Sequence, residues 1–460
     1  MPIFTVGAAG TTSTGFDING SAMFYENSLA SRTVSSAGNR RTFTISQWVK
    51  KSTIGASDMV IFCAGNSTND QLNIFFRDTL TVQDETGNVQ NFNFATNATF
   101  TDTNAWYHIV IAVDTTQATE SNRFKMYVNG QQITSFNIET YPTQNLETNV
   151  NKTINHSIAG RGYQNSQYFD GYLAECVLID GQQLTPTSFG EFDTDSGIWK
   201  PIDPRGLTFG TNGHYYNFAT KATDPVDASG NGHNMTSSNV LSTDYSKDTP
   251  FNNYCTLNAN SEHNDSTFSD GNLTYTGNAS AVHNAIGSIG VTQGKWYFEA
   301  KRVTGNSAYP FVGVFKVDGS MGSYLGATLD GWTILMDATD NGEWRNNGTL
   351  SGTSAGTFTN GNIAMIAIDM DNGKIWFGKD GTWAASGNPS AGSGEQYSNL
   401  TGTIVPAVAV YTGASVALNF GSPLYSISSG NSDANGYGNF EHAVPTGFYA
   451  INSKNLAEFG

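Results

Sequence analysis

The stretch WYHIVIAVDTTQATESNRFKMYVNG, from Trp106 to Gly130, decides the fold class of this chain. Ile109 to Val113 is apolar at every position, which is typical of a strand buried on both faces inside a sandwich. A polar loop opens at Asp114, and a return strand from Phe124 to Val128 ends in an Asn-Gly turn. The stretch therefore predicts an antiparallel hairpin in the core of a β-sandwich.

A later stretch, IAMIAIDMDNGKIWFGKDG from Ile363 to Gly381, repeats the pattern. Its buried strand ends at Asp369, a tight turn follows at Asp371 to Gly373, and Ile375 to Phe377 returns to an Asp-Gly pair. Two such units predict an all-β chain with two antiparallel β-sandwich, or jelly-roll, domains.

Composition agrees with this fold class. Only 13% of the 460 residues are charged, against about 25% in an average soluble domain. Asn, Thr, Ser and Gly must cover the surface instead, and these residues favour strands and turns over helix interiors. The formal net charge is −17, which would repel phosphate backbones. Because Lys and Arg gather in no patch, we expect no nucleic-acid partner.

Terminal and cysteine patterns restrict the class further. The N-terminus shows no basic-then-apolar segment, and no apolar run reaches about 18 residues. We therefore expect neither a secretory signal nor membrane insertion. Cys63, Cys176 and Cys255 lie far apart without zinc-ligand spacing and are expected to be buried thiols.

Changes in composition divide the chain into four parts. Residues 1–220 contain the first hairpin and residues 255–425 the second. Between them, residues 221–254 are polar, include Pro225 and Pro250, and predict a connector. A small, polar stretch follows residue 425, and apolar character returns at Val444 to Leu456, so residues 426–460 are expected to dock onto a sandwich.

Four motifs follow one another in the first domain: ISQWVKK from Ile45 to Lys51, then NAWYHIVIAVD, FKMYVNGQQI and FDGYLAECVLIDGQQLTP. In this order they resemble the laminin-G-like, concanavalin-type jelly rolls, over about residues 1–215. In the second domain, GKWYFEAKR from Gly294 to Arg302, VGVF, GSYLG, IAIDMDNGKIWFGKDGTW, VPAVAV and LNFG resemble the SPRY family, over about residues 255–425.

The two resemblances imply binding rather than catalysis, since both kinds of sandwich mostly bind carbohydrate or protein through loops. Joined without a visible signal peptide, they resemble structural proteins of tailed bacteriophages. This implies a non-enzymatic protein on the virion surface, as a tail-fibre, receptor-binding or capsid-decoration component made in the host cytoplasm. Its expected partners are other virion proteins, a host surface glycan and further copies of itself, with many weak contacts acting together.

Two other classes of function stay open: a glycan-degrading enzyme with a laminin-G-like carbohydrate module, and a cellular SPRY interaction adaptor. A retaining glycosidase needs two carboxylates about 5–5.5 Å apart. The nearest string, Glu191 to Asp195 (EFDTD), lacks the final Glu of the laminarinase-type motif and follows a turn signature. We therefore expect solvated loop acids there and no catalytic residues.

A metal site has one weak candidate. Asp227, Ser229 and Asn231 place oxygen-bearing side chains at alternate positions, as a Ca²⁺ loop would. No bidentate Glu follows at the EF-hand distance, so an Asx turn is the alternative. No other cofactor is expected.

Aromatic side chains in polar surroundings are the last candidates. Trp332, Trp344 and Trp383 stand in Gly-, Asn- and Asp-rich stretches, and Arg345 follows Trp344. Flat rings beside hydrogen-bond donors can stack on sugars or form protein hot spots. The sequence thus predicts a ligand surface on loops that carry these four residues, with a loop Trp folded over the sandwich edge as the alternative.

Overall fold

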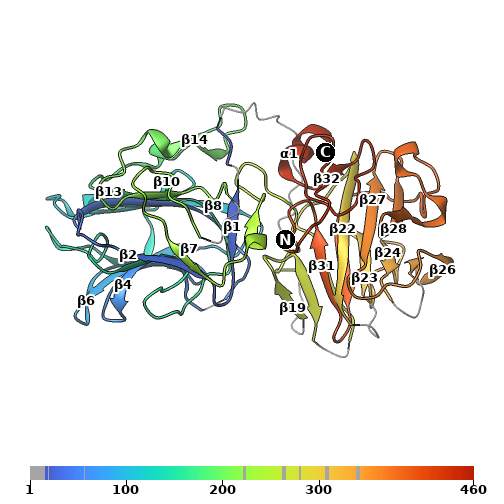
Figure 1. Ribbon diagram of the computed structural model, residues 1–460, viewed down its shortest axis with the longest axis horizontal. Helices are drawn as coiled ribbons and strands as arrows, with labels where there is room; N and C mark the ends of the chain where they lie inside the picture. The colour runs from blue at the N-terminus through green and yellow to red at the C-terminus, as the bar shows by residue number, and fades with distance from the viewer. Residues whose placement is uncertain are drawn as a thin grey trace. The chain divides into compact units, whose positions relative to one another are not determined.

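The computed structural model describes residues 16–18, 20–55, 57–220, 224–261, 266–278, 281–305, 310–337 and 342–460. The chain is all-β, and it divides into two compact units between Phe251 and Asn252. In each unit two sheets face each other across an apolar core (Figure 1). Among the described residues, no helix is long and apolar enough to cross a membrane.

The first unit contains two eight-stranded antiparallel sheets. The strands of one sheet, in spatial order, are β10 (Gln131–Gln132), β9 (Phe124–Val128), β8 (Trp106–Asp114), β3 (Thr42–Lys51), β13 (Gly171–Asp180), β1 (Ser21–Phe24) and β18 (Tyr245–Ser246), with β16 (His214–Tyr216) also paired to β13. Those of the other are β11 (Phe136–Thr140), β7 (Val89–Thr99), β6 (Thr79–Thr86), β5 (Asp70–Phe76), β4 (Met59–Ser67), β12 (Asn155–Ile158), β2 (Leu29–Thr33) and β17 (Thr236–Ser238). A small separate pair is formed by β14 (Gly190–Phe192) and β15 (Trp199–Pro201).

The second unit pairs an eight-stranded sheet with a six-stranded one. The larger sheet consists of β19 (Ser266–Ser269), β20 (Thr274–Gly277), β31 (Ser415–Asn419), β22 (Lys295–Thr304), β27 (Ile363–Asp369), β28 (Lys374–Lys379), β29 (Thr382–Trp383) and, beside β22, β32 (Tyr449–Ala450). The smaller consists of β21 (His283–Ile286), β30 (Ile404–Val410), β23 (Phe311–Lys316), β24 (Gly331–Leu335), β25 (Glu343–Asn346) and β26 (Thr349–Ser354).

Helical structure is confined to short segments of the described chain. One α-helix, α1 (Ser453–Phe459), lies near the C-terminus. The 3-10 turns span Glu120–Asn122, Pro186–Ser188, Pro204–Gly206, Ser242–Asp244, Ala384–Ser386 and Pro389–Ala391.

Both hairpins expected from the sequence are present. β8 pairs with β9 in the first unit and β27 with β28 in the second. The apolar runs bury both faces, because one set of side chains enters the sandwich core and the alternate set is covered by loops or turns. Cys63, Cys176 and Cys255 are buried free thiols, as expected.

The C-terminal segment packs on the larger sheet of the second unit. β32 runs parallel to β22, and Phe440 and Phe448 bury their rings against the outer face of that sheet. The Glu299 carboxylate anchors the segment, since it accepts the backbone N–H groups of Glu441 at 3.0 Å and His442 at 2.8 Å.

The expected connector, residues 221–254, is not a linker. Residues 221–223 lie outside the described part, but the rest up to Phe251 belongs to the first unit. Within it β17 pairs with β2 and β18 with β1, and the Asp248 carboxylate meets the buried Lys50 ammonium at 2.7 Å. The segment is polar because it is held to the sandwich by backbone pairing and by an ion pair. Tyr254, at its other end, is buried in the second unit.

Candidate functional site

The structure does not bring the four predicted ligand residues together on an exposed surface. Trp332 lies in β24 and Trp344 in β25, and both side chains are buried in the same core, at 2% and 6% exposure. The Trp332 indole N–H donates to the Asn399 side-chain oxygen at 2.8 Å. The expectation that Trp344 lies on a loop is therefore wrong. Its strand is only four residues long, and pairing with β24 buries the ring opposite Ile334.

Arg345 and Trp383 point to other surfaces. Arg345 alternates with Trp344, so it lies on the outer face of the smaller sheet, with its guanidinium 5.1 Å from the Tyr324 ring and 5.7 Å from the Phe311 ring. Trp383 packs beside Tyr297 in the aromatic cluster on the outer face of the larger sheet. These positions give no common site for one ligand.

Removing the Trp344 ring is therefore expected to destabilise the second unit. Trp344→Ala deletes a buried ring and leaves a cavity, which we expect to cost about 3 kcal/mol, the low end for Trp→Ala in a core. Thermal denaturation of the full chain should show one transition lowered by several degrees. Val303→Ala, a change at a 40% exposed side chain on β22, is the control. An unchanged melting temperature for Trp344→Ala would contradict the burial seen here.

The side chains of the candidate metal loop, Asp227, Ser229 and Asn231, form hydrogen bonds within the protein. The Asp227 carboxylate accepts the backbone N–H groups of Tyr215, Ser229 and His233 and the Ser229 hydroxyl, at 2.8–2.9 Å. Burial alone would raise the pKa of Asp227, but these bonds hold it below its usual value. The Asn231 amide donates to the carbonyls of Gly210 and Gly213. The three side chains thus fasten a turn to the sandwich.

The acidic string near β14 has the wrong electrostatics for a glycosidase. Lys200 lies between two of the acids, 3.5 Å from the Glu191 carboxylate and 3.0 Å from that of Asp193. Hydrogen bonds from the Ser196 backbone and the Lys200 side chain lower the pKa of Asp193. A general acid needs a raised pKa, so Asp193 is unsuited to that role.

A cluster that the sequence did not indicate lies in the first unit, where Ser46, His108 and Trp199 meet. His108 on β8 is buried, with Trp48 stacked on its ring at 4.8 Å. Its Nε2 lies 2.8 Å from the Ser46 hydroxyl, the arrangement of a nucleophile and its base. No motif spacing could have revealed this, because β3, β8 and β15 bring the residues together only in the folded chain.

The direction of the hydrogen bonds at His108 shows that Ser46 and His108 are not a nucleophile and its catalytic base. The Trp199 indole, which can only donate, gives its N–H to His108 Nδ1 at 2.9 Å. A neutral His108 must then carry its proton on Nε2 and donate to Ser46, whereas a catalytic base accepts the serine proton there. Burial also lowers the pKa of His108 to about 3, so the ring is a very weak base.

Glu175 completes the lining around this pair. It occupies a bulge of β13, with φ +49°, and accepts a hydrogen bond from the Tyr215 hydroxyl. Burial raises its pKa to about 8, with the Tyr215 bond opposing the shift. A raised carboxyl pKa beside a His marks a functional candidate. The space left between Glu175, Trp48, His108 and Phe189 is, however, only about the size of a water molecule.

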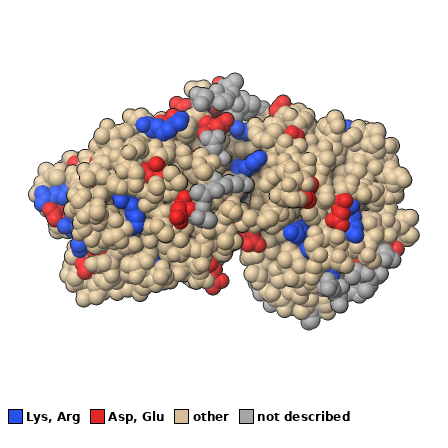
Figure 2. Space-filling model, in the orientation of Figure 1, with Lys and Arg blue, Asp and Glu red and all other residues tan. Residues whose placement is uncertain are grey.

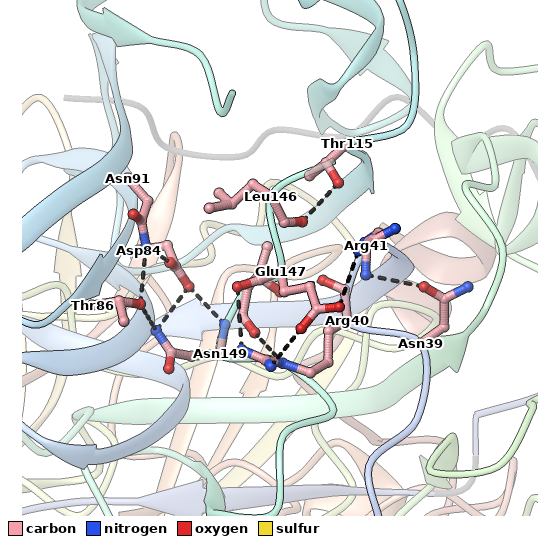
Figure 3. A network of polar contacts seen from close by, with 11 residues as sticks. Asn39, Arg40, Arg41, Asp84, Thr86, Asn91, Thr115, Leu146, Glu147 and Asn149 are labelled. Carbon is pink, nitrogen blue, oxygen red and sulfur yellow. Dashed lines mark hydrogen bonds and ion pairs between the residues drawn. The ribbon is translucent and has the colours of Figure 1, made fainter. Parts of the chain in front are cut away.

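A second buried acid, Asp84, belongs to the polar network in Figure 3. Its carboxylate accepts the Asn149 backbone N–H at 3.0 Å and the Asn91 amide at 2.6 Å. Burial raises the pKa of Asp84 to about 6, and the bonds from Asn149 and Asn91 oppose this. Close by, Glu147 pairs with both Arg40 and Arg41. The network holds the segment around residue 147 against the sandwich and offers no free charged group.

Comparison with known proteins agrees with the geometry of the first unit. Residues 26–187 match the profile of the concanavalin A-like lectin/glucanases superfamily. Within the first unit, these residues are similar to concanavalin A-like domains. No curated protein sequence matches the chain.

Parts of the chain are similar to solved structures at low sequence identity and low TM-score. The human HERC1 SPRY domain is 21% identical, with 33% of this chain and 91% of that chain covered and a TM-score of 0.28. The TRIM65 PSpry domain is 12% identical, with 36% of this chain and 91% of that chain covered and a TM-score of 0.29. A candidate carbohydrate-binding protein from Bacteroides ovatus is 16% identical, with 49% of this chain and 60% of that chain covered and a TM-score of 0.33.

Proposed function

We propose that this chain is a non-catalytic binding protein displayed on the surface of a tailed-phage virion. The observation that carries the non-catalytic role is that His108 donates a hydrogen bond to Ser46 instead of accepting one. In addition, Lys200 forms ion pairs with both Glu191 and Asp193. These acid–base groups of the described residues are thereby occupied in holding the fold. The concanavalin A-like unit is a fold that often binds ligands.

The virion setting is supported by the surface and by the two sequence resemblances. Charged residues make up 13% of the chain, and on the face in Figure 2 they form scattered spots among uncharged atoms. An uncharged, hydroxyl- and amide-rich surface suits a protein that contacts glycans or sister subunits rather than nucleic acid. Many copies on one particle would strengthen weak individual contacts.

Two measurements test this function. Mass spectrometry of gradient-purified particles from a lysate should detect the chain in a fixed ratio to a major capsid protein. Its absence from particles, with the chain present in the unassembled fraction, would remove the virion role. Incubation with β-glucans should release no reducing ends above buffer; release abolished by Glu191→Gln would restore the glycosidase alternative.

A further inference from the structure

The Glu175 side chain points out of the sandwich core only because β13 bulges at this position. Leu173 packs in the core, and strict alternation along the strand would send Glu175 there as well. The pairing of β13 with β3 shifts register between Ala174 and Val177, and Glu175 takes φ +49° within this shift. Its carboxyl group lines the small cavity on the outer face of the sheet instead. Backbone strain of this kind is typical of functional sites.

The Glu175 carboxyl group is 5% exposed, and no ion pair joins it to a Lys or Arg side chain of the described residues. It accepts a hydrogen bond from the Tyr215 hydroxyl. The neighbouring His108 ring is neutral, because burial lowers its pKa to about 3. The Arg205 guanidinium pairs with Asp203 at 2.6 Å. A buried carboxylate needs a cation or a proton, and the surrounding side chains supply no cation.

Ser46 brings a second oxygen atom to the lining of the same cavity. Because the Trp199 indole donates to His108 Nδ1, the protonated Nε2 of His108 donates to the Ser46 hydroxyl oxygen. A hydroxyl oxygen has two lone pairs, so Ser46 keeps one lone pair and its own proton for a further contact. No partner for either occurs among the hydrogen bonds of the described residues. The oxygen is thus held in place by His108 and is still able to bind a ligand.

The size and the remaining lining of the cavity restrict the ligand further. The cavity is about as large as one water molecule. Trp48 and Phe189 contribute aromatic rings to its lining, and the faces of such rings attract cations. Apolar side chains of the segment that covers the sheet, Pro201, Ile202 and Pro204, line the rest. A sodium, potassium or ammonium ion fits such a space, whereas an organic cation such as choline is several times too large.

We propose that this cavity binds one small monovalent cation, held by the Glu175 carboxylate and the Ser46 hydroxyl oxygen. One carboxylate balances one positive charge, so a monovalent ion leaves no net charge buried. Sodium, potassium and ammonium ions share this chemistry. The bound ion fastens the segment of residues 186–204 to the sheet, because Phe189 and Pro201 of that segment line the same cavity. The inference depends neither on the binding role proposed above nor on the virion setting.

Scanning calorimetry of the full chain at about pH 8.5 tests the proposal, with sodium, potassium or ammonium chloride compared with choline chloride at equal ionic strength. At least one small cation, at ten times its dissociation constant, should raise the melting temperature of the first unit by about 3–6 °C. At about pH 6 the rise should be much smaller. Burial raises the pKa of Glu175 to about 8, so a proton then competes with the ion for the carboxylate. The second unit is the internal control and should melt alike in all four salts.

Three variants assign the effect to the cavity. Glu175→Gln should abolish the dependence on small cations and still fold, because Gln can accept the Tyr215 hydrogen bond without a charge. Ser46→Ala keeps the carboxylate and should weaken cation binding at least tenfold. Glu191→Gln, at a 49% exposed acid of the same unit, is the matched control and should leave binding unchanged.

Three results would overturn the proposal. Equal melting temperatures in choline and in every small-cation salt would mean that a neutral acid and a water molecule fill the cavity. A rise that survives both Glu175→Gln and Ser46→Ala, or one that is the same at both pH values, would mean that the ion binds elsewhere. None of these results bears on whether purified particles contain the chain.

Discussion

Acidification is expected to unfold the first unit well before the second. His108, His156 and His214 are buried in the first unit. Burial lowers the pKa of His108 from 6.5 to about 3 and that of His156 to about 4. Burial, with the nearby Arg32 charge, lowers the pKa of His214 well below 6.5. The folded unit therefore holds three neutral imidazoles that the unfolded chain protonates.

The direction of the effect follows from proton binding. Below pH 6.5 the unfolded chain binds protons that the folded unit excludes, so each histidine removes about 1.4 kcal/mol of stability per pH unit. Glu175 and Asp84 act in the opposite direction. Their raised pKa values, about 8 and about 6, mean that the folded unit takes up protons before the unfolded chain does.

The sum of these effects gives a maximum of stability near pH 6.5. Between pH 6.5 and 4.5 the two acids offset part of the loss, and the unit should lose about 3 kcal/mol. Below about pH 4.5 Glu175 no longer compensates, because the unfolded Glu is then protonated too, and the loss steepens. About 3 kcal/mol is a large share of the 5–15 kcal/mol that holds a typical domain folded.

Scanning calorimetry of the full chain from pH 8 to pH 4 measures this directly. The second unit is the internal control, because its described histidines, His283 and His442, are only half-buried. His156→Gln can keep both hydrogen bonds of the ring, to the Asn151 N–H and the Ile154 carbonyl, without titrating. This variant should flatten the acid limb of the first transition. Two transitions that shift equally with pH would contradict the prediction.

What the sequence could predict depends on how local the signal is. The β8–β9 and β27–β28 hairpins were predictable because each strand is a run of apolar residues next to its own turn. Trp344 was not, since the four-residue strand β25 has no periodicity and its burial comes from pairing with β24. The contact of Ser46 and Trp199 with His108 likewise exists only through strand pairing, which no single segment encodes.

The same reason explains the error at residues 221–254. A stretch rich in Asp, Ser and Asn has the composition of a linker. Composition does not show, however, whether its charged residues pair with residues far away in the sequence. Asp248 finds Lys50 on β3 and the Trp106 indole on β8, both far away in the sequence. Buried charges of this kind occur almost only in pairs.

Asp248→Asn should therefore be among the most damaging single substitutions in the first unit. Lys50 and Asp248 are 1% and 2% exposed, with the Lys50 Nζ 2.7 Å from one carboxylate oxygen. The other oxygen accepts the Trp106 indole N–H at 3.0 Å. Removing the negative charge leaves a buried ammonium uncompensated, which typically costs about 3–5 kcal/mol. Thermal denaturation should show the first unit melting far earlier, with the second unit unchanged.

Two companion variants separate charge from packing. Glu147→Gln removes the ion pairs with Arg40 and Arg41, whose shared carboxylate is 51% exposed, and it should change stability by only about 0–1 kcal/mol. Replacing both buried partners, Lys50→Met with Asp248→Leu, should recover most of the loss, because no unpaired charge remains. If Asp248→Asn behaved like Glu147→Gln, the segment would be a loosely attached connector after all. A fragment ending at Thr220 sharpens the test: it lacks Asp248 as well as β17 and β18, and it should fail to fold where a fragment ending at Phe251 succeeds.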